Sequence, residues 1–205
     1  LPPYFFRHGL HPDEPRSLGT LVGPEHFSEV RHAHHHALLR AQDEIMRADA
    51  DWADVVGRQY GVLLEVRGNP DATLGILTLG SVLGTLEDAM EENPDLPQAR
   101  FIKLRSFRPF PAQALREACA GLEHLIVLER ALSPGYGGIV GPEVQAVLAG
   151  QPSPPRIHNV AAGLGGRDLS LDLYARLVHL IDSGGEPEPF RIIDADPSLL
   201  PEEDR

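Results

Sequence analysis

Between residues 73 and 181, short apolar runs alternate with segments of helical periodicity, and this alternation strongly limits the folds open to the chain. Each apolar run is short enough for one buried strand, and in each following segment apolar residues recur at spacings of three and four. Strands separated by helices are typical of a parallel sheet buried on both faces. The sequence therefore predicts an α/β domain, with an open, mostly parallel sheet and helices on both faces. The expected strands are 73–79, 101–104, 124–129 and 156–160.

The sequence patterns divide the chain into four predicted parts. Residues 61–183 form the α/β domain. Residues 1–23 are rich in proline and glycine and predict an extended arm or linker. Residues 24–60 predict one long helix, which we interpret as a brace between domains or subunits because it exceeds the usual length for a small domain. Residues 184–205 are acidic and rich in proline, and we expect a loose tail or a tail that docks on a partner.

Composition narrows the class of partner. The chain has 18 basic and 30 acidic residues and a formal net charge of −12, so a phosphate backbone would be repelled and nucleic acid is not expected as a partner. No apolar run approaches the roughly 18 residues of a membrane span. The one cysteine, Cys119, lies in a helical pattern and is interpreted as a small core residue. A cytoplasmic location fits these features.

Glycine-rich turns after two of the strands are candidate contact sites. At the first, Gly80 and Ser81, free amides at a helix start could hold an anion; the alternative is a tight turn that lets helix and strand pack closely. The second turn also leads from a strand into a helix, and it could contact a ligand, contact another subunit, or be a purely local turn. Its candidate residues are Ser133, Gly135, Tyr136, Gly137 and Gly138.

A small basic group stands out in this acidic chain. Lys103, Arg105 and Arg108 lie at the end of the second strand, where they could bind a phosphate or a carboxylate, although a salt-bridged interface is the interpretation we favour. His32 and His36 share a helix face, but without an HExxH motif we predict solvated positions and no metal site. No nucleophile elbow and no cysteine–histidine pair is present, so no catalytic residue is predicted.

Three runs, taken together, resemble the pyruvate:ferredoxin oxidoreductases and their 2-oxoacid relatives. The first is Leu-Gly-Ser at 79–81, and the second is Lys-Leu-Arg-Ser-Phe-Arg-Pro-Phe-Pro at 103–111. The third is Val-Leu-Glu-Arg at 127–130, followed by Ser-Pro-Gly-Tyr-Gly-Gly at 133–138. The run Gly-Leu-Gly-Gly-Arg-Asp at 163–168 is similar to the closing motif of the family. The resemblance covers roughly residues 1–180 of this sequence and is to the C-terminal, transketolase-C-terminal-like region of the family's α-type chain.

This resemblance implies a complex that oxidatively and reversibly decarboxylates a 2-oxoacid with coenzyme A. Thiamine diphosphate, Mg²⁺ and [4Fe-4S] clusters are expected in the complex, and electrons would pass to ferredoxin or flavodoxin. The Gly-Asp-Gly motif for diphosphate and magnesium and the cluster cysteines are absent here, so this chain is expected to bind no cofactor alone and to serve assembly and channel shaping with other subunits. The alternatives are a stand-alone anion- or nucleotide-binding module and the C-terminal domain of a transketolase-like enzyme.

Overall fold

A computed structural model describes residues 11–15, 19–182 and 187–204. The chain divides into two units, Leu1–Arg40 and Ala41–Arg205. Most of the predicted arm at 1–23 lies outside the described residues. Within the described part, no helix is long and apolar enough to cross a membrane.

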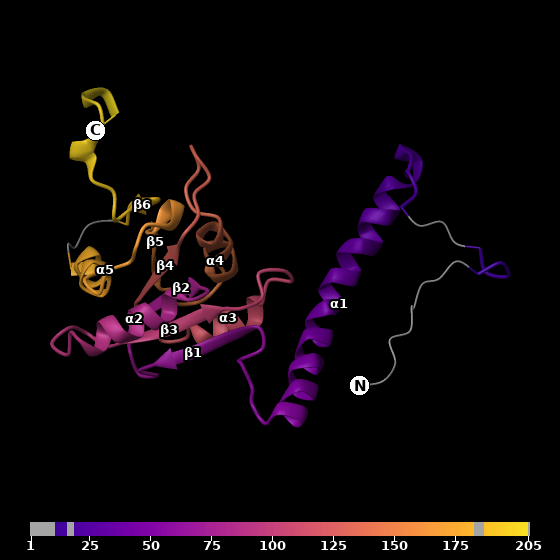
Figure 1. Ribbon diagram of the computed structural model, residues 1–205, viewed down its shortest axis with the longest axis horizontal. Helices are drawn as coiled ribbons and strands as arrows, with labels where there is room; N and C mark the ends of the chain where they lie inside the picture. Colours follow the sequence, from indigo (N-terminus) through magenta and orange to yellow (C-terminus); the bar gives the residue numbers. More distant parts are fainter. Residues whose placement is uncertain (1–10, 16–18, 183–186, 205) are drawn as a thin grey trace. The chain divides into compact units, whose positions relative to one another are not determined.

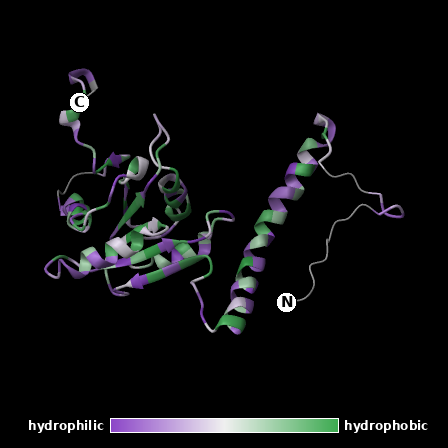
Figure 2. Cartoon of the chain, viewed as in Figure 1, coloured by the Kyte–Doolittle hydropathy of each residue, from purple (hydrophilic) through white to green (hydrophobic). Residues whose placement is uncertain are grey.

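The long helix predicted from residue 24 is present as α1, Pro24–Val56. Proline suits the first turn of a helix because its missing N–H would have no partner there. None of the 33 residues of α1 is buried, and Figure 2 shows hydrophobic and hydrophilic residues mixed along it. Phe27, Trp52 and Val55 are each more than half exposed. Its role as a brace remains a prediction.

The second unit contains a six-stranded sheet, which confirms the predicted fold class (Figure 1). The strand order is β1-β3-β2-β4-β5-β6, and all neighbouring strands run parallel except β1, which is antiparallel to β3. The four predicted strands lie within one or two residues of their expected limits. The strands are β1 (Leu64–Gly68), β2 (Leu74–Leu79), β3 (Ala99–Leu104), β4 (His124–Glu129), β5 (Arg156–Ala161) and β6 (Arg191–Ile192).

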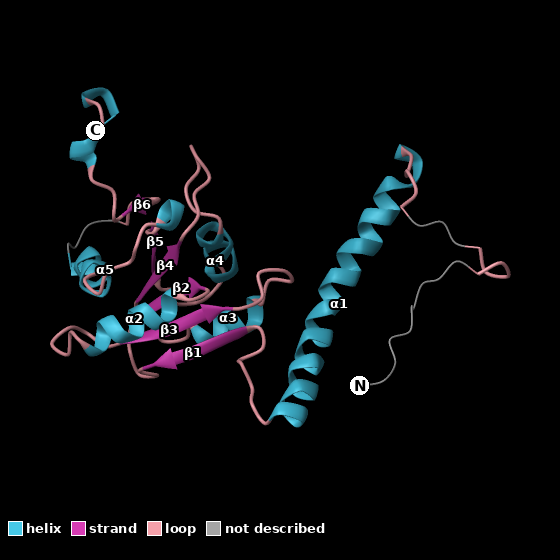
Figure 3. Cartoon of the chain, in the orientation of Figure 1, coloured by secondary structure: helices cyan, strands magenta, loops and turns pink. Residues whose placement is uncertain are grey.

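Helices cover both faces of the sheet, as predicted (Figure 3). Helices α2 (Val82–Glu91) and α5 (Leu173–Asp182) pack on one face, and α3 (Ala112–Ala118) and α4 (Val140–Leu148) pack on the other. Successive side chains of a strand point to opposite faces. Ile76 therefore contributes to the core beneath α2 and α5, whereas its neighbour Leu77 contributes to the core beneath α3 and α4. Both are fully buried, which is why the central strands are continuous apolar runs.

The two edge strands were not predicted. Strand β1 is short and half-exposed, and its charged residues Glu65 and Arg67 give it no apolar run. Strand β6 belongs to the segment that we expected to be a loose or partner-docked tail. Instead, Arg191 and Ile192 pair with Val160 and Ala161 of β5, so this part of the segment joins the sheet of its own chain.

A pair of histidines lies on the neighbouring strands β4 and β5. Nδ1 of His124 is 3.1 Å from Nε2 of His158, which is only 6% exposed. Burial, together with the smaller effects of the nearby His124 and Arg156, lowers the pKa of His158 to about 4. The neutral form of His158 is therefore the form that the folded chain favours.

This pair predicts a loss of stability in mild acid. An unfolded histidine binds a proton near pH 6.5, whereas His158 in the folded chain does so only near pH 4, so stability is complete above pH 6.5 and falls as the pH drops toward 4. Urea unfolding at several pH values measures this. Between pH 6.5 and 5, His158→Gln should lose less stability than the unchanged chain, and the exposed His179→Gln should follow the unchanged chain. Equal slopes for all three would contradict the assignment.

Candidate functional site

Between β2 and β4, the direction in which successive strands are added to the sheet reverses. The chain passes from β2 to β3 on one side and from β4 to β5 on the other. The loops after Leu79 and Glu129 therefore diverge, and in open parallel sheets such a point commonly forms a crevice for ligands. Two pockets lie here, one on each face of the sheet.

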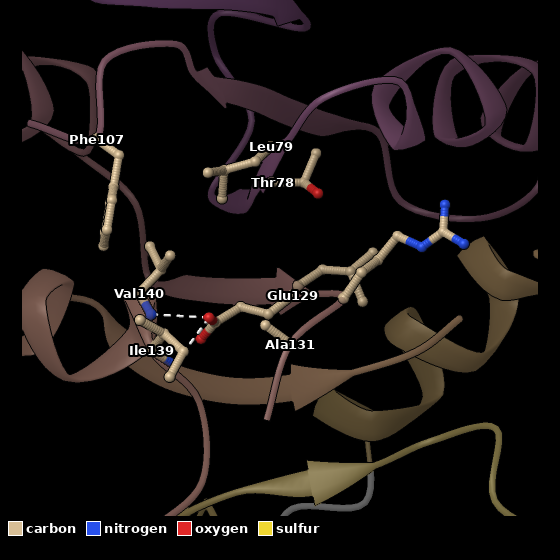
Figure 4. A pocket seen from close by; sticks show the side chains of 9 residues that line it. Thr78, Leu79, Phe107, Glu129, Ala131, Ile139 and Val140 are labelled. Carbon is tan, nitrogen blue, oxygen red and sulfur yellow. Dashed lines mark hydrogen bonds between the residues drawn. The ribbon is translucent and has the colours of Figure 1, made fainter. Parts of the chain in front are cut away.

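The first, here called the apolar pocket, lies on the α4 side and has a volume of about 280 Å³. Figure 4 shows Leu79 and Phe107 across the pocket from Ile139 and Val140, with the carboxylate of Glu129 between the strand and the helix start. Most of its wall is apolar. The lining residues are Thr78, Leu79, Phe107, Leu128, Glu129, Arg130, Ala131, Ile139 and Val140.

Glu129 is the one acidic group of this pocket, and its carboxylate is already engaged. The side chain is only 3% exposed. It accepts hydrogen bonds from the backbone N–H groups of Ile139, Val140 and Gly141, at 2.9, 2.7 and 2.9 Å. These amides begin α4 and have no partner within the helix, so the carboxylate caps the helix and lies at the positive end of its dipole. The start of α4 therefore cannot also hold a ligand anion.

Close approach between strand and helix explains two glycines. A Cβ atom at Gly138 would lie 2.2 Å from Oε1 of Glu129, and a Cβ atom at Gly141 would lie 2.3 Å from Oδ1 of Asn159. Either distance is far below van der Waals contact. The absence of a side chain at both positions lets α4 begin directly on the buried carboxylate.

The second pocket, here called the arginine pocket, lies on the α2 side of the same edge and has a volume of about 290 Å³. Its lining is mostly polar. It shares Arg130 with the apolar pocket, and it also contains the first turn of α2 and the loop after β5. The lining residues are Ser81, Val82, Thr85, Arg130, Arg167, Asp168 and Leu169.

The loop after β5 holds Arg130 in place. Nε and one terminal nitrogen of Arg130 each donate to the carbonyl oxygen of Gly163, at 3.2 Å. Gly163 has a φ of +72°, and a Cβ atom there would lie 2.9 Å from Nε of Arg130. A side chain at this position would be strained and would displace the guanidinium. The N–H of Gly163 donates to the carboxylate of Asp194, at 2.8 Å.

Comparison with known proteins identifies the domain. The family description "Pyruvate:ferredoxin oxidoreductase core domain II" matches residues 72–173, which include β2 to β5 and both pockets. The chain belongs to the pyruvate:ferredoxin oxidoreductase family. This confirms the family that the sequence motifs predicted.

The chain is also similar to named subunits of oxidoreductases. The chain is 33% identical over 162 residues to the pyruvate synthase subunit PorA of Methanothermobacter thermautotrophicus, an alignment covering 78% of this chain and 41% of the relative. It is 29% identical over 160 residues to the ketoisovalerate oxidoreductase subunit VorA of Pyrococcus abyssi, covering 78% of this chain and 40% of the relative. The chain thus spans less than half the length of these relatives.

A solved structure of a 2-oxoglutarate:ferredoxin oxidoreductase from Magnetococcus marinus, with 2-oxoglutarate, coenzyme A and succinyl-CoA bound, is also similar. The match covers 74% of this chain and 23% of that chain, with 18% sequence identity and a TM-score of 0.41.

The candidate residues of the two glycine turns lie at different places on the edge of core domain II. Ser81 lines the arginine pocket, and Gly80 immediately precedes it. The turn at 133–138 is a tight loop in which the N–H of Ser133 donates to the carbonyl of Gly137, at 2.7 Å. Gly135 and Tyr136 lie at its tip, where Tyr136 is 71% exposed. Gly137 and Gly138 lie at its base, where an added Cβ atom would come within 3.0 Å of Phe190 and 2.2 Å of Glu129, respectively.

The basic candidates are partly neutralised within core domain II. Arg108 makes two hydrogen bonds to the carboxylate of Glu143, one of them 2.8 Å long. Arg105 lies 3.5 Å from the carboxylate of Glu65. Lys103 is paired in register with that same glutamate. Arg105 and Arg108 therefore already have an acidic partner in the chain, and the three residues do not join either pocket.

Metal-binding groups are not gathered at this edge. Across the residues that the structure describes, no group of three or more His, Cys, Asp or Glu side chains is placed to hold a metal ion. The rings of His32 and His36 lie 4.3 Å apart on α1, and both residues are exposed. Cys119 is buried against the core beneath α3 and α4, and burial raises the pKa of its thiol to about 12.

Apart from Ser81, sequence reasoning did not single out the residues that line the two pockets. A glutamate at the end of an otherwise apolar strand, followed by three glycines within the next ten residues, was a signal for the buried carboxylate of Glu129. Arg130 and Arg167 belong to the runs at 127–130 and 163–168, but nothing in the sequence indicated that they line the same pocket. The contribution of Asp194 depends on β6, which has too few residues to be recognised from a pattern.

The cap formed by Glu129 gives a stability prediction. Glu129→Gln replaces one acceptor oxygen with an NH₂ group that faces backbone donors, so the free energy of unfolding should fall by about 2 kcal/mol. Glu143→Gln is the matched control, because it removes a surface ion pair with Arg108 and should change stability by about 0.5 kcal/mol or less. Urea unfolding measures both. Equal effects of the two substitutions would show that the buried cap has no special role.

Proposed function

We propose that this chain is part of a thiamine-diphosphate-dependent 2-oxoacid:ferredoxin oxidoreductase. The complex would oxidatively decarboxylate pyruvate or a related 2-oxoacid with coenzyme A, in a reversible reaction, and pass electrons to ferredoxin or flavodoxin. Family membership supports this proposal, as do the subunit names of the relatives. Because relatives act on different 2-oxoacids by name, we leave the acid open.

Within that complex, the proposed role of the chain is assembly and channel shaping. The observation that carries this proposal is the engagement of Glu129. It is the one carboxylate in the wall of the apolar pocket, and three backbone amides already bind it. A carboxylate held in this way is poorly placed to move a proton in a reaction. The pocket thus offers shape and an apolar surface to a neighbouring part of the enzyme.

An exposed apolar rim beside this pocket is suited to contact a partner subunit. Leu132, Tyr136 and Ile139 are 37%, 71% and 41% exposed, and all belong to the loop between β4 and α4. Exposed aromatic and aliphatic groups gathered beside a pocket are typical of interaction surfaces. We separately propose that the long helix at 24–60 is a brace between domains or subunits, because none of the residues of α1 is buried.

The cofactors are assigned to other parts of the complex. Thiamine diphosphate, Mg²⁺ and [4Fe-4S] clusters would be held by chains or domains that carry the Gly-Asp-Gly and cysteine motifs. We also propose a cytoplasmic location, consistent with a single cysteine, Cys119, that is a free thiol in the core.

Co-purification tests the proposal directly. The tagged chain should retain a chain that carries Gly-Asp-Gly and cysteine motifs, and the retained complex should reduce ferredoxin when a 2-oxoacid and coenzyme A are added. The chain alone should be inactive. If it purifies without such a partner from its own cells, or turns over a 2-oxoacid unaided, the proposed function is wrong.

The apolar rim gives a sharper prediction. Tyr136→Ala combined with Ile139→Ser should weaken retention of the partner by about tenfold or more, because exposed apolar anchors contribute strongly at interfaces. Val66→Ser is the matched control, since it removes a 46% exposed apolar side chain from the opposite edge strand β1. Retention is measured by quantitative pull-down, with circular dichroism as the check on folding. Equal retention by both variants would exclude the rim from the interface.

A further inference from the structure

We propose that the arginine pocket binds a phosphate group carried by a small molecule or present as the free ion. The proposal concerns the α2 side of the sheet edge and does not depend on the assembly role assigned to the apolar pocket. It rests on a pocket of about 290 Å³ whose lining includes two arginines, Arg130 and Arg167, and two hydroxyl residues, Ser81 and Thr85.

The two arginines of this pocket keep their charge available. Arg130 donates to the carbonyl of Gly163, and Arg167 donates to the backbone carbonyl of Asp194. A carbonyl oxygen carries no net charge, so these bonds orient the guanidiniums without neutralising them. Arg67, Arg108 and Arg191, in contrast, each lie against a carboxylate. Two oriented guanidiniums facing one cavity suit the geometry of phosphate oxygens.

Acidic groups near the pocket limit the positive charge without cancelling it. Asp168 is part of the lining. The carboxylate of Asp194 is bonded to the N–H of Gly163, and that of Asp196 accepts from the N–H and hydroxyl of Ser198. Arg167 lowers the pKa of Asp196, although the bonds to Ser198 lower it more. Asp168 is therefore the acidic group whose charge would oppose a bound anion most directly.

The first turn of α2 adds donors on the opposite wall. Ser81 and Thr85 are four residues apart and so lie on the same side of the helix, both in the pocket lining. Ser81 occupies the N-cap position, but its side chain makes no capping hydrogen bond, and the first turn contains no acidic residue. The start of α4 has the buried Glu129 as its anion, whereas the first turn of α2 contains no acidic residue of its own.

A third pocket shows what an arginine pair looks like when it is neutralised. Arg176 and Arg191 both line a pocket between α5 and β6, of about 370 Å³. Arg176 is bonded to Asp172 at 2.6 Å, and Arg191 is bonded to Glu188. Arg176 is therefore a matched control, because it is the same residue type in a pocket of comparable size but is paired with a carboxylate.

Calorimetry with the full 205-residue chain tests the proposal. The probes are inorganic phosphate, coenzyme A and pantetheine, which lacks phosphate. Binding of coenzyme A much tighter than inorganic phosphate would identify a nucleotide-type ligand, and comparable binding of both would identify the free ion. If no probe binds, or if pantetheine binds as well as coenzyme A, the pocket does not recognise phosphate and the proposal is overturned.

Substitutions that are expected to change the affinity in opposite directions distinguish an effect on phosphate binding from an effect on folding. Arg167→Gln should weaken the binding that is found by about tenfold or more, and Asp168→Asn should tighten it by about threefold, because a like charge is removed. Arg176→Gln should leave it unchanged, and all three variants should keep the unfolding temperature of the parent chain. Equal weakening by Arg167→Gln and Arg176→Gln, or weakening by Asp168→Asn, would refute the site. Co-purification with a partner is read separately, so either proposal can fail alone.

Discussion

The capping of α4 by the buried carboxylate of Glu129 is the interaction on which the functional edge depends. A charge in the core is costly unless hydrogen bonds compensate it, and three backbone amides do so here. The same bonds fix where α4 begins relative to β4. They also set the floor of the apolar pocket, and the carboxylate leaves room only for glycine at 138, whereas glycine at 141 is required by Asn159. One side chain thus determines where the helix begins, the shape of the pocket and the residue at position 138.

The sheet itself could be predicted because its central strands are buried on both faces. Residues 74–77 and 125–128 have no polar side chain, since both Ile76 and its neighbour Leu77 must face a helix layer. The helices between them show their buried side through spacing alone. Strands β1 and β6 gave no such signal, because β1 is half-exposed and β6 has only two residues. Edge strands depend on pairing with a neighbour, which local sequence does not encode.

The candidate site was predictable only in outline. Glycine turns after strands drew attention to the carboxyl edge of the sheet, and Ser81 lines one of its pockets. The basic residues 103, 105 and 108 drew attention because they are rare in an acidic chain, yet Arg105 and Arg108 pair with carboxylates at distant positions. Arg130 and Arg167 define the polar pocket, and they meet only because β4 and β5 are neighbours. The order of strands in the sheet, and not the local sequence, brings these two arginines into one pocket.

Gly163 links the last part of the chain to the centre of the sheet edge through its two backbone groups. Its carbonyl receives Arg130, which both pockets share, and its N–H reaches Asp194, just after β6. Through Gly163, the C-terminal segment therefore helps to position Arg130, a residue more than sixty positions before Asp194. A neighbouring protein that competed for the backbone of this segment would displace it from the sheet. The N–H of Gly163 would then lose its acceptor, and the carbonyl that positions the guanidinium of Arg130 would be released.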